Sequence, residues 1–438
     1  MKRKITIIMA FLSVALAQAQ QIDKSKLDQY FQVLAENNKF MGSIAVSKNG
    51  KVLYSHSVGF TDLASGAKAN ENSKYRIGSI SKTFTAVLIF KAVEENKLDL
   101  NKTIDQYFPT IKNANKITIQ QLLYHRSGIH NFTNDESYTH WNTQPKSEKE
   151  MVEIIAKGGS DFEPDSKANY SNSGFVLLTY ILEKTYKKTY AKLLEEKIVK
   201  PLGLKNTYFG GKINGKNNEC NSYSYAQGWK KETETDMSIP LGAGGIVSTP
   251  TDLTKFGEGL FTGKLISKKS LEQMETIKDN YGMGLFKFPF NDKICYGHTG
   301  GIDGFSSTFS YFPTEEISFA ITSNALDYKM NNIALTVLGG VFGKSIEIPE
   351  FKTYDVKVED LGQYTGVYSS KQIPIQITVT KDDKTLIAQA TGQSSFPLSS
   401  TAKDKFEFAQ AGVILEFKPT ENTMVLKQGG GEFTFTKE

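Results

Sequence analysis

Apolar residues at the start of the chain recur first with the spacing of a helix and then with that of strands. Between positions 24 and 38 they follow the i, i+3, i+4, i+7 pattern of an amphipathic helix, at Leu27, Tyr30, Phe31 and Leu34. Two strand-like segments, 42–47 and 51–55, then flank Asn49-Gly50, a strong signal for a two-residue hairpin turn. The pattern predicts a helix that packs on a sheet beginning with this hairpin.

The middle of the chain is predicted to be helical. Residues 83–96 form a helix that is almost continuously apolar from Phe84 to Phe90, so we expect that helix to be buried. From position 98 to 204, helical periodicity recurs between polar loops, in segments 117–124, 148–157 and 174–198. We interpret this stretch as an all-helical region inserted into the sheet domain.

The pattern returns to strands after a helix predicted at 251–261. Segments 294–297, 306–312 and 317–322 are strand-like, and a last helix is predicted at 331–342. These segments are expected to rejoin the sheet and to cover it.

Beyond position 346 the chain carries only short, regularly spaced strands, which is typical of an antiparallel barrel or sandwich. They are predicted at 375–380, 385–390, 405–409, 413–418, 424–427 and 432–436. The expected fold class is α+β, an antiparallel sheet flanked by helices with an inserted helical region, followed by an all-β, barrel or lipocalin-like domain. The expected bounds are 20–345 for the first domain and 349–438 for the second.

The N-terminus has the pattern of a secretory leader. Lys2, Arg3 and Lys4 precede an apolar run from 5 to 17, and Ala17-Gln18-Ala19 is a small-x-small cleavage site. Because the run is too short to span a bilayer comfortably, we expect a cleaved signal peptide at residues 1–19 rather than an anchor. The expected location is periplasmic or secreted, without a membrane span after cleavage.

Charge and cysteine content argue against several classes of partner and scaffold. Without the leader, 49 basic and 47 acidic residues remain, and they are scattered, so neither nucleic acid nor an anionic membrane is expected as a partner. Cys220 and Cys295 are the two cysteines, which is no disulfide framework, and whether they pair stays open. The oligomeric state also stays open.

The residues around Ser79 offer a candidate nucleophile. If a helix begins near Ser79, Lys82 lies one turn further along the same face, where its amine can contact the serine hydroxyl. An adjacent base can take the hydroxyl proton, and a helix N-terminus stabilises negative charge developing on the oxygen. Since Ser-x-x-Lys also occurs at Ser65 and Ser400, the pattern alone is equally consistent with an ordinary helix start.

Two further motifs, each found once in the chain, form a pattern with Ser79. They are Tyr170-Ser171-Asn172 and His298-Thr299-Gly300. The order and wide spacing of the three resemble the penicillin-recognising serine hydrolases, a family that includes class C β-lactamases, D-alanyl-D-alanine carboxypeptidases, D-aminopeptidases and related esterases. Segments 122–129, 201–204 and 244–253 also look typical of this family, and the resemblance runs from about residue 24 to residue 343.

The resemblance implies a role for each motif. Ser79 is expected to be the acylated nucleophile, with Lys82 and Tyr170 sharing the proton transfers, and which of these two is the base stays open. Burial is expected to lower the pKa of Lys82, and adjacent positive charge to lower that of Tyr170. Asn172 is expected to bind the substrate amide, the alternative being an ordinary turn asparagine.

The third motif is expected to line the substrate site. The N–H groups of Ser79 and Gly301 are assigned to the oxyanion hole, and glycine at 300 and 301 allows close approach of the backbone. His298, Thr299 and Gly300 are assigned to substrate binding, although His298 is also consistent with a structural histidine at a strand end.

Position 298 departs from the β-lactamases, which carry lysine there. Histidine titrates near neutrality and binds an anion more weakly than a permanent cation does. By resemblance, members with histidine are mostly peptidases and esterases, so we expect a serine hydrolase for small peptides, amides or esters that contain D-amino acids, with peptidoglycan-derived peptides as one candidate source. A broad esterase or a β-lactamase of the same family is the alternative.

Other classes of protein remain as hypotheses. A metal hydrolase has little support, because the histidines at 56, 125, 130, 140 and 298 fall in no ligand spacing, and we expect neither metal nor cofactor. An α/β-hydrolase would need Gly-x-Ser-x-Gly, which is missing. An acylated sensor with little turnover, using the C-terminal domain for recognition, would carry the same motifs.

Overall fold

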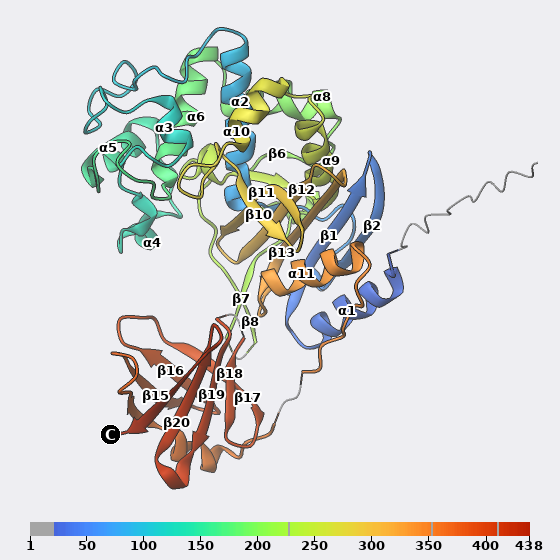
Figure 1. Cartoon of the computed structure of the whole chain (residues 1–438), viewed down its shortest axis with the longest axis vertical. Helices are drawn as coiled ribbons and strands as arrows, with labels where there is room; N and C mark the ends of the chain where they lie inside the picture. The colour runs from blue at the N-terminus through green and yellow to red at the C-terminus, as the bar shows by residue number, and fades with distance from the viewer. Residues whose placement is uncertain (1–21, 227, 352–353, 410) are drawn as a thin grey trace, which may run out of the picture.

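The structure is a computed structural model that describes residues 22–226, 228–351, 354–409 and 411–438 (Figure 1). The leader predicted at residues 1–19 lies outside the described residues. None of the described helices is long and apolar enough to span a bilayer. A mixed α/β part runs as far as α11 (Met330–Val341), and an all-β part begins with β14 (Gly366–Ser369), as the expected fold class requires.

An antiparallel sheet in the order β10-β11-β12-β13-β1-β2 forms the centre of the α/β part. Its strands are β10 (Phe286–Phe290), β11 (Lys293–Ile302), β12 (Phe305–Phe312), β13 (Ile317–Leu326), β1 (Phe40–Lys48) and β2 (Lys51–Val58). Positive φ at both Asn49 and Gly50 produces the predicted hairpin turn between β1 and β2. Because β1 pairs with β13, the N-terminal hairpin joins strands from the far end of the domain.

Helices cover both faces of this sheet. Helix α1 (Lys24–Glu36) and α11 pack on one face, where Leu27 and Phe31 are buried with Ile333 (Figure 1). Helix α9 (Pro250–Phe261) packs on the other face, with the ring of Phe256 6.0 Å from that of Phe309. The side of the sheet that meets α9 also meets the helical region, so both share one core.

The helical region lies between the hairpin and α9. Its helices are α2 (Ser81–Glu94), α3 (Ile119–Leu123), α4 (Tyr138–Trp141), α5 (Glu148–Gly158), α6 (Asn172–Tyr186), α7 (Tyr190–Leu194) and α8 (Lys200–Leu202), with α10 (Lys268–Glu275) following α9. The single helix predicted at 174–198 is wrong, because the chain turns left-handed at Lys187, with φ of 52°. Thr189 then caps α7 by accepting a hydrogen bond from the Lys192 N–H.

Short strands lie in the connecting segments. They are β3 (Phe60–Asp62), β4 (Ala67–Lys68), β5 (Tyr75–Arg76), β6 (Tyr208–Phe209), β7 (Tyr223–Tyr225), β8 (Trp229–Lys231) and β9 (Ile246–Ser248). Two of them, β7 and β8, extend the central sheet, because β7 pairs in parallel with β13. Strand β9 lies between β5 and β6 in a three-stranded sheet. This small sheet fixes the backbone that leads directly into Ser79.

The C-terminal part is a closed barrel of eight antiparallel strands. After β14 come β15 (Gln376–Asp382), β16 (Thr385–Ala390), β17 (Phe396–Ala402), β18 (Lys405–Phe408), β19 (Val413–Lys418), β20 (Thr423–Gln428) and β21 (Gly431–Lys437). The sequence pattern missed β14, which is short, and β17, which contains Pro397 and a run of small polar residues. Closure of the barrel needs both, because β14 pairs with β21 and β17 with β18.

The two cysteines do not form a disulfide. Cys220 and Cys295 are both free and buried. Cys220 lies with Tyr75 and Phe305 in a small apolar cluster, whereas Cys295 belongs to the core between the sheet and α11.

Candidate active site

Ser79 lies in a tight turn that opens the buried helix α2. Strand β5 ends at Arg76, a 3-10 turn spans Gly78–Ile80, and α2 follows without a break. The Nζ atom of Lys82, one turn into the helix, is 3.0 Å from the Ser79 hydroxyl oxygen. The structure therefore brings the two residues of the first motif into direct contact, as their spacing predicts.

Lys82 is fully buried and has three oxygen partners. Besides Ser79, its amine contacts Asn172 Oδ1 and the Ala243 carbonyl oxygen, each at 2.7 Å. Burial lowers the pKa of Lys82 well below its ordinary value, as expected. In the neutral form, two N–H donors match the oxygens of Asn172 and Ala243, which leaves the nitrogen lone pair for the Ser79 hydroxyl. The arrangement suits a base that receives the serine proton.

Tyr170 lies beside the serine and the lysine. The Lys82 Nζ lies 4.8 Å from the centre of its ring. Burial raises the pKa of Tyr170 above its ordinary value, and the nearby Ser79 side chain only partly offsets this. The expectation of a lowered tyrosine pKa is therefore wrong, because desolvation of the phenolate outweighs its neighbours. The phenol stays protonated and can donate a proton.

The Asn172 side chain is held at both ends by the protein. Its Oδ1 accepts from Lys82, its Nδ2 donates to Thr133 Oγ1 at 3.0 Å, and its backbone N–H donates to Asn131 Oδ1 at 2.9 Å. In this state the amide orients Lys82, which is a more specific role than that of a turn residue. The partners Asn131, Thr133 and Ala243 carry no motif, so the sequence analysis missed them.

Strand β11 brings the third motif beside the nucleophile. A side-chain carbon on Gly300 would lie 2.0 Å from the Ile77 carbonyl oxygen, and one on Gly78 would lie 2.7 Å from the Gly301 nitrogen. Such distances are impossible, so glycine at 78 and 300 allows the two backbones to touch. The structure thus places Gly301 against the segment of Ser79, where both N–H groups were assigned to the oxyanion hole.

His298 is buried and neutral. Its Nδ1 lies 2.5 Å from the Thr299 carbonyl oxygen, and since a carbonyl only accepts, Nδ1 carries the proton and Nε2 is left as an acceptor. Burial is the main cause that lowers its pKa to about 3. The expectation that this histidine titrates near neutrality is therefore wrong. At physiological pH the site presents an uncharged acceptor where a β-lactamase is expected to carry a cation.

His125 is a site residue that sequence analysis did not single out. Its ring centre lies 4.5 Å from that of Tyr170, and its Nδ1 accepts a hydrogen bond from the Ser171 N–H at 3.1 Å. Burial is the main cause that lowers its pKa well below the ordinary value. The neutral ring therefore supports the phenol and the backbone of the second motif. Its presence in the family-like segment 122–129 was the available signal.

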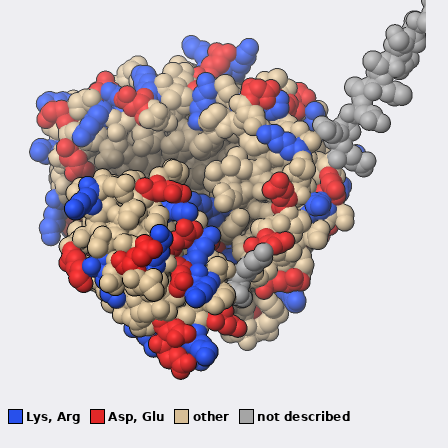
Figure 2. Space-filling model, turned by 60° about the horizontal axis from the view of Figure 1, so that its bottom comes forward, with Lys and Arg blue, Asp and Glu red and all other residues tan. Residues whose placement is uncertain are grey.

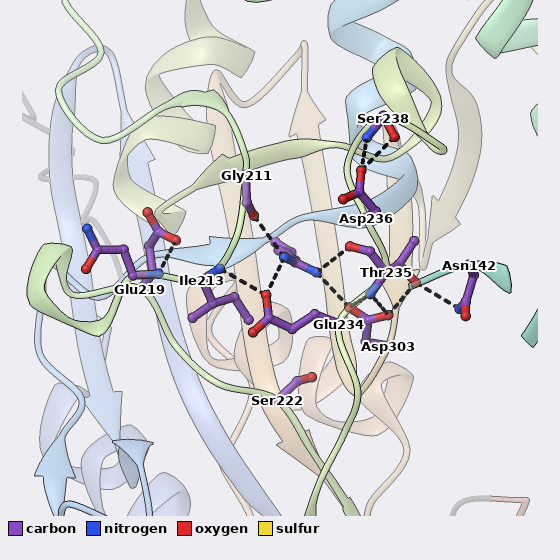
Figure 3. A network of polar contacts seen from close by, with 12 residues as sticks. Asn142, Gly211, Ile213, Glu219, Ser222, Glu234, Thr235, Asp236, Ser238 and Asp303 are labelled. Carbon is purple, nitrogen blue, oxygen red and sulfur yellow. Dashed lines mark hydrogen bonds and ion pairs between the residues drawn. The ribbon is translucent and has the colours of Figure 1, made fainter. Parts of the chain in front are cut away.

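A polar network and a cavity lie next to these residues. Figure 3 shows Glu234, Thr235 and Asp303 grouped close together, with Gly211 nearby. Arg76, three residues before Ser79, donates to acceptors on all four of these residues. The cavity has a volume of about 860 Å³ and is lined by Arg76, Thr143, residues 209–212, residues 231–238 and Leu241.

The face of the molecule seen in Figure 2 is hollowed. The walls of the hollow consist mostly of residues other than Lys, Arg, Asp and Glu, and charged residues surround its rim. Among the described residues, no group of three or more His, Cys, Asp and Glu side chains is placed to hold a metal ion.

Comparison with known proteins gives consistent matches. A family model described as Beta-lactamase matches residues 27–338. A penicillin-binding protein of Bacillus subtilis is 25% identical over 448 residues, which covers 94% of this chain and 98% of the relative. Teichoic acid D-alanine hydrolase of Staphylococcus aureus is 28% identical over 314 residues, covering 70% of this chain and 74% of that protein.

A solved structure extends these matches to three dimensions. It is that of D-amino acid amidase from Ochrobactrum anthropi SV3 in complex with D-phenylalanine, which superimposes with a TM-score of 0.64 at 25% sequence identity. The match covers 73% of this chain and 99% of the amidase chain.

Proposed function

This chain belongs to the Beta-lactamase family and is a serine hydrolase, and we propose that it cleaves esters or amides of D-amino acids whose amino group is free. The proposal is more specific than membership of the family. It names an acyl-enzyme on Ser79 and a substrate that brings a donor, rather than a carboxylate, to His298.

The neutral state of His298 carries this proposal. A penicillin or a peptide ending in D-alanyl-D-alanine presents a carboxylate, and an uncharged imidazole whose Nε2 only accepts hydrogen bonds gives that carboxylate no partner. An ammonium or amide N–H group is a donor and suits the same atom. Two similar proteins, the D-alanine hydrolase and the D-amino acid amidase, are named for D-amino acid substrates.

The proposed mechanism follows from the contacts of Ser79. Neutral Lys82 takes the hydroxyl proton as the serine oxygen attacks the substrate carbonyl carbon. The N–H groups of Ser79 and Gly301 stabilise the charge developing on the carbonyl oxygen. Tyr170, protonated in the resting state, donates a proton to the leaving alcohol or amine and recovers one from Lys82. Water then cleaves the acyl-enzyme, with the same groups moving its protons.

A panel of substrates tests the proposal. The full chain without residues 1–19 is assayed with D-alanine p-nitroanilide, its N-acetyl derivative, a D-alanyl-D-alanine peptide and a chromogenic cephalosporin. We expect the free-amine substrate to be preferred, and its hydrolysis to be lost in Ser79→Ala. Preference for the peptide or the cephalosporin would contradict the assignment of the substrate class. Equal activity of Ser79→Ala would contradict the nucleophile.

Mass spectrometry separates an enzyme from an acylated sensor. An enzyme releases more than one molecule of product per molecule of protein, and the acyl adduct on Ser79 is transient. A stable adduct without product release would favour the sensor.

We also propose that the protein acts outside the cytoplasm. This proposal depends on the leader expected at residues 1–19 and is tested by fractionating cells that express the full chain.

A further inference from the structure

A buried ion pair joins the two segments that carry the proposed oxyanion donors. Arg76 Nη1 lies 2.9 Å from Asp303 Oδ2, and the two side chains are only 3% and 4% exposed. Arg76 precedes Ser79 by three residues, and Asp303 follows Gly301 by two. The pair therefore fastens the end of β5, just before the nucleophile, to the turn that ends β11.

The ion pair belongs to a larger set of hydrogen bonds. Arg76 also donates to the carbonyl oxygens of Thr235 and Gly211, at 3.1 and 2.9 Å, and to Glu234 Oε2 at 3.1 Å. Asp303 accepts from the hydroxyl of Thr235 at 2.7 Å and from its backbone N–H at 3.1 Å (Figure 3). Both charged groups are held from several directions, so neither can move without breaking several bonds.

Fold stability alone is a weak reason for such a pair. Desolvation of two buried charges offsets most of their attraction, and apolar replacements of buried ion pairs are often as stable. Burial also raises the pKa of Asp303, although Thr235 and Arg76 oppose this. Asp303 in addition has φ of 51°, a left-handed conformation that glycine adopts at lower cost. Neither fold stability nor backbone conformation therefore accounts for a buried carboxylate at position 303.

The spacing of the two donor segments depends on close backbone packing. The Gly301 nitrogen lies so near Gly78 that a single added carbon would clash at 2.7 Å. Ser307 of β12, the residue paired with Gly300 of β11, donates to the Ile77 carbonyl oxygen at 2.9 Å, so the neighbouring strand also holds the segment of Ser79. An oxyanion hole works only when both donors keep their aim to within about 0.5 Å. A small displacement of either segment changes that aim.

We propose that Arg76 and Asp303 are positioning residues that set the separation of the Ser79 and Gly301 N–H groups. Each side chain acts through the backbone segment that it holds rather than on the reacting atoms. The inference rests on the proposed roles of Ser79 and Gly301, and it is independent of which amino-acid derivative the enzyme cleaves.

A fluorophosphonate probe tests this without an amino-acid substrate. The Ser79 oxygen forms a bond to phosphorus, the P–F bond breaks, fluoride leaves, and Lys82 takes the hydroxyl proton, while the phosphoryl oxygen occupies the oxyanion hole. We expect Asp303→Asn to lower the rate constant of labelling roughly 10- to 100-fold, somewhat less than the loss of a whole donor. The pH dependence of labelling should keep the same midpoint, because Lys82 is untouched.

Two further variants keep the test decisive. Asp327→Asn removes the carboxylate of a partly buried ion pair, that with Lys39 at 2.6 Å, and should label at the wild-type rate. Asp303→Glu retains the charge but lengthens the side chain, and it should also label slowly. It replaces Asp303→Asn in the test if that variant fails to fold. A folded Asp303 variant that labels within twofold of wild type would overturn the proposal, as would an equal loss in Asp327→Asn. Failure of the D-amino acid substrates would leave the labelling result intact and so would identify the proposed function as the part at fault.

Discussion

The amine of Lys82 lies 2.7 Å from the side-chain oxygen of Asn172, so a neutral amide rather than a carboxylate is its nearest side-chain acceptor, closer than the Ser79 hydroxyl at 3.0 Å. A neutral amide does not stabilise the ammonium form of Lys82 as a carboxylate would, so burial keeps the pKa of Lys82 low. In the proposed mechanism, the second motif therefore sets the protonation state of a residue in the first.

Asn172→Asp tests this relationship. A carboxylate beside the amine favours the ammonium form and raises the pKa of Lys82, and a base is active only above its pKa. We expect kcat/KM at pH 7 to fall roughly 10- to 100-fold, and the acid limb of its pH profile to move to higher pH. Asn172→Ser, which adds no charge, is the control. An unmoved acid limb in the aspartate variant would show that Lys82 is not the base.

Lys82→Met should abolish turnover without unfolding the protein. Methionine fills much of the space of the lysine stem and needs no hydrogen bond, so removal of a buried amine leaves stability nearly unchanged. Loss of the base should lower kcat by about 10² to 10⁴. Thermal unfolding and kcat are measured on the same samples. If Tyr170→Phe loses all activity while Lys82→Met retains most of it, the phenol is the base instead.

His298→Lys should change the preferred substrate. A cation at this position gives a substrate carboxylate a partner and repels a free ammonium. The ratio of kcat/KM for a D-alanyl-D-alanine peptide to that for a D-alanine amide should rise at least about tenfold, which corresponds to about 1.4 kcal/mol. His298→Gln keeps the position neutral and should leave the ratio near that of wild type. A ratio unchanged in the lysine variant would mean that position 298 does not contact the discriminating group.

His130 gives the helical region a pH-dependent contribution to stability. Its ring nitrogens lie 2.9 Å from Asp161 and 3.1 Å from Asp135, and these hydrogen bonds raise its pKa above the ordinary value despite partial burial. A raised folded pKa stabilises the fold fully below the unfolded pKa of about 6.5 and loses that effect as pH rises through the folded pKa.

His130→Gln should therefore cost more stability at pH 5.5 than at pH 8.5. We expect Tm to fall by about 2 °C at the lower pH, with little change at the higher one. His140→Gln, at a solvent-exposed histidine of the same region, is the matched control and should show no such dependence. A loss that is equal at both pH values would assign His130 a packing role without an ionic one.

Much of the architecture could be predicted because short-range physics determines it. The apolar spacing of α1, the Asn49-Gly50 turn and the buried run in α2 all depend on residues within a few positions of one another. The pattern failed where a local break was weakly marked, at Lys187, and where a strand was short or interrupted by proline, in β14 and β17. Barrel closure itself depends on pairing between β14 and β21, whose sequence separation leaves no local signal.

The sequence by itself determined which residues could carry the chemistry, since a serine, a lysine, a tyrosine and a histidine in these motifs name the groups and their order. Only the tertiary structure decided their charge states. Burial lowers the pKa of Lys82, keeps Tyr170 protonated and makes His298 neutral. Desolvation depends on everything that packs around a group, which the sequence does not show. The Arg76–Asp303 pair could not be predicted from the sequence either, because 227 positions separate two side chains that only the fold brings together.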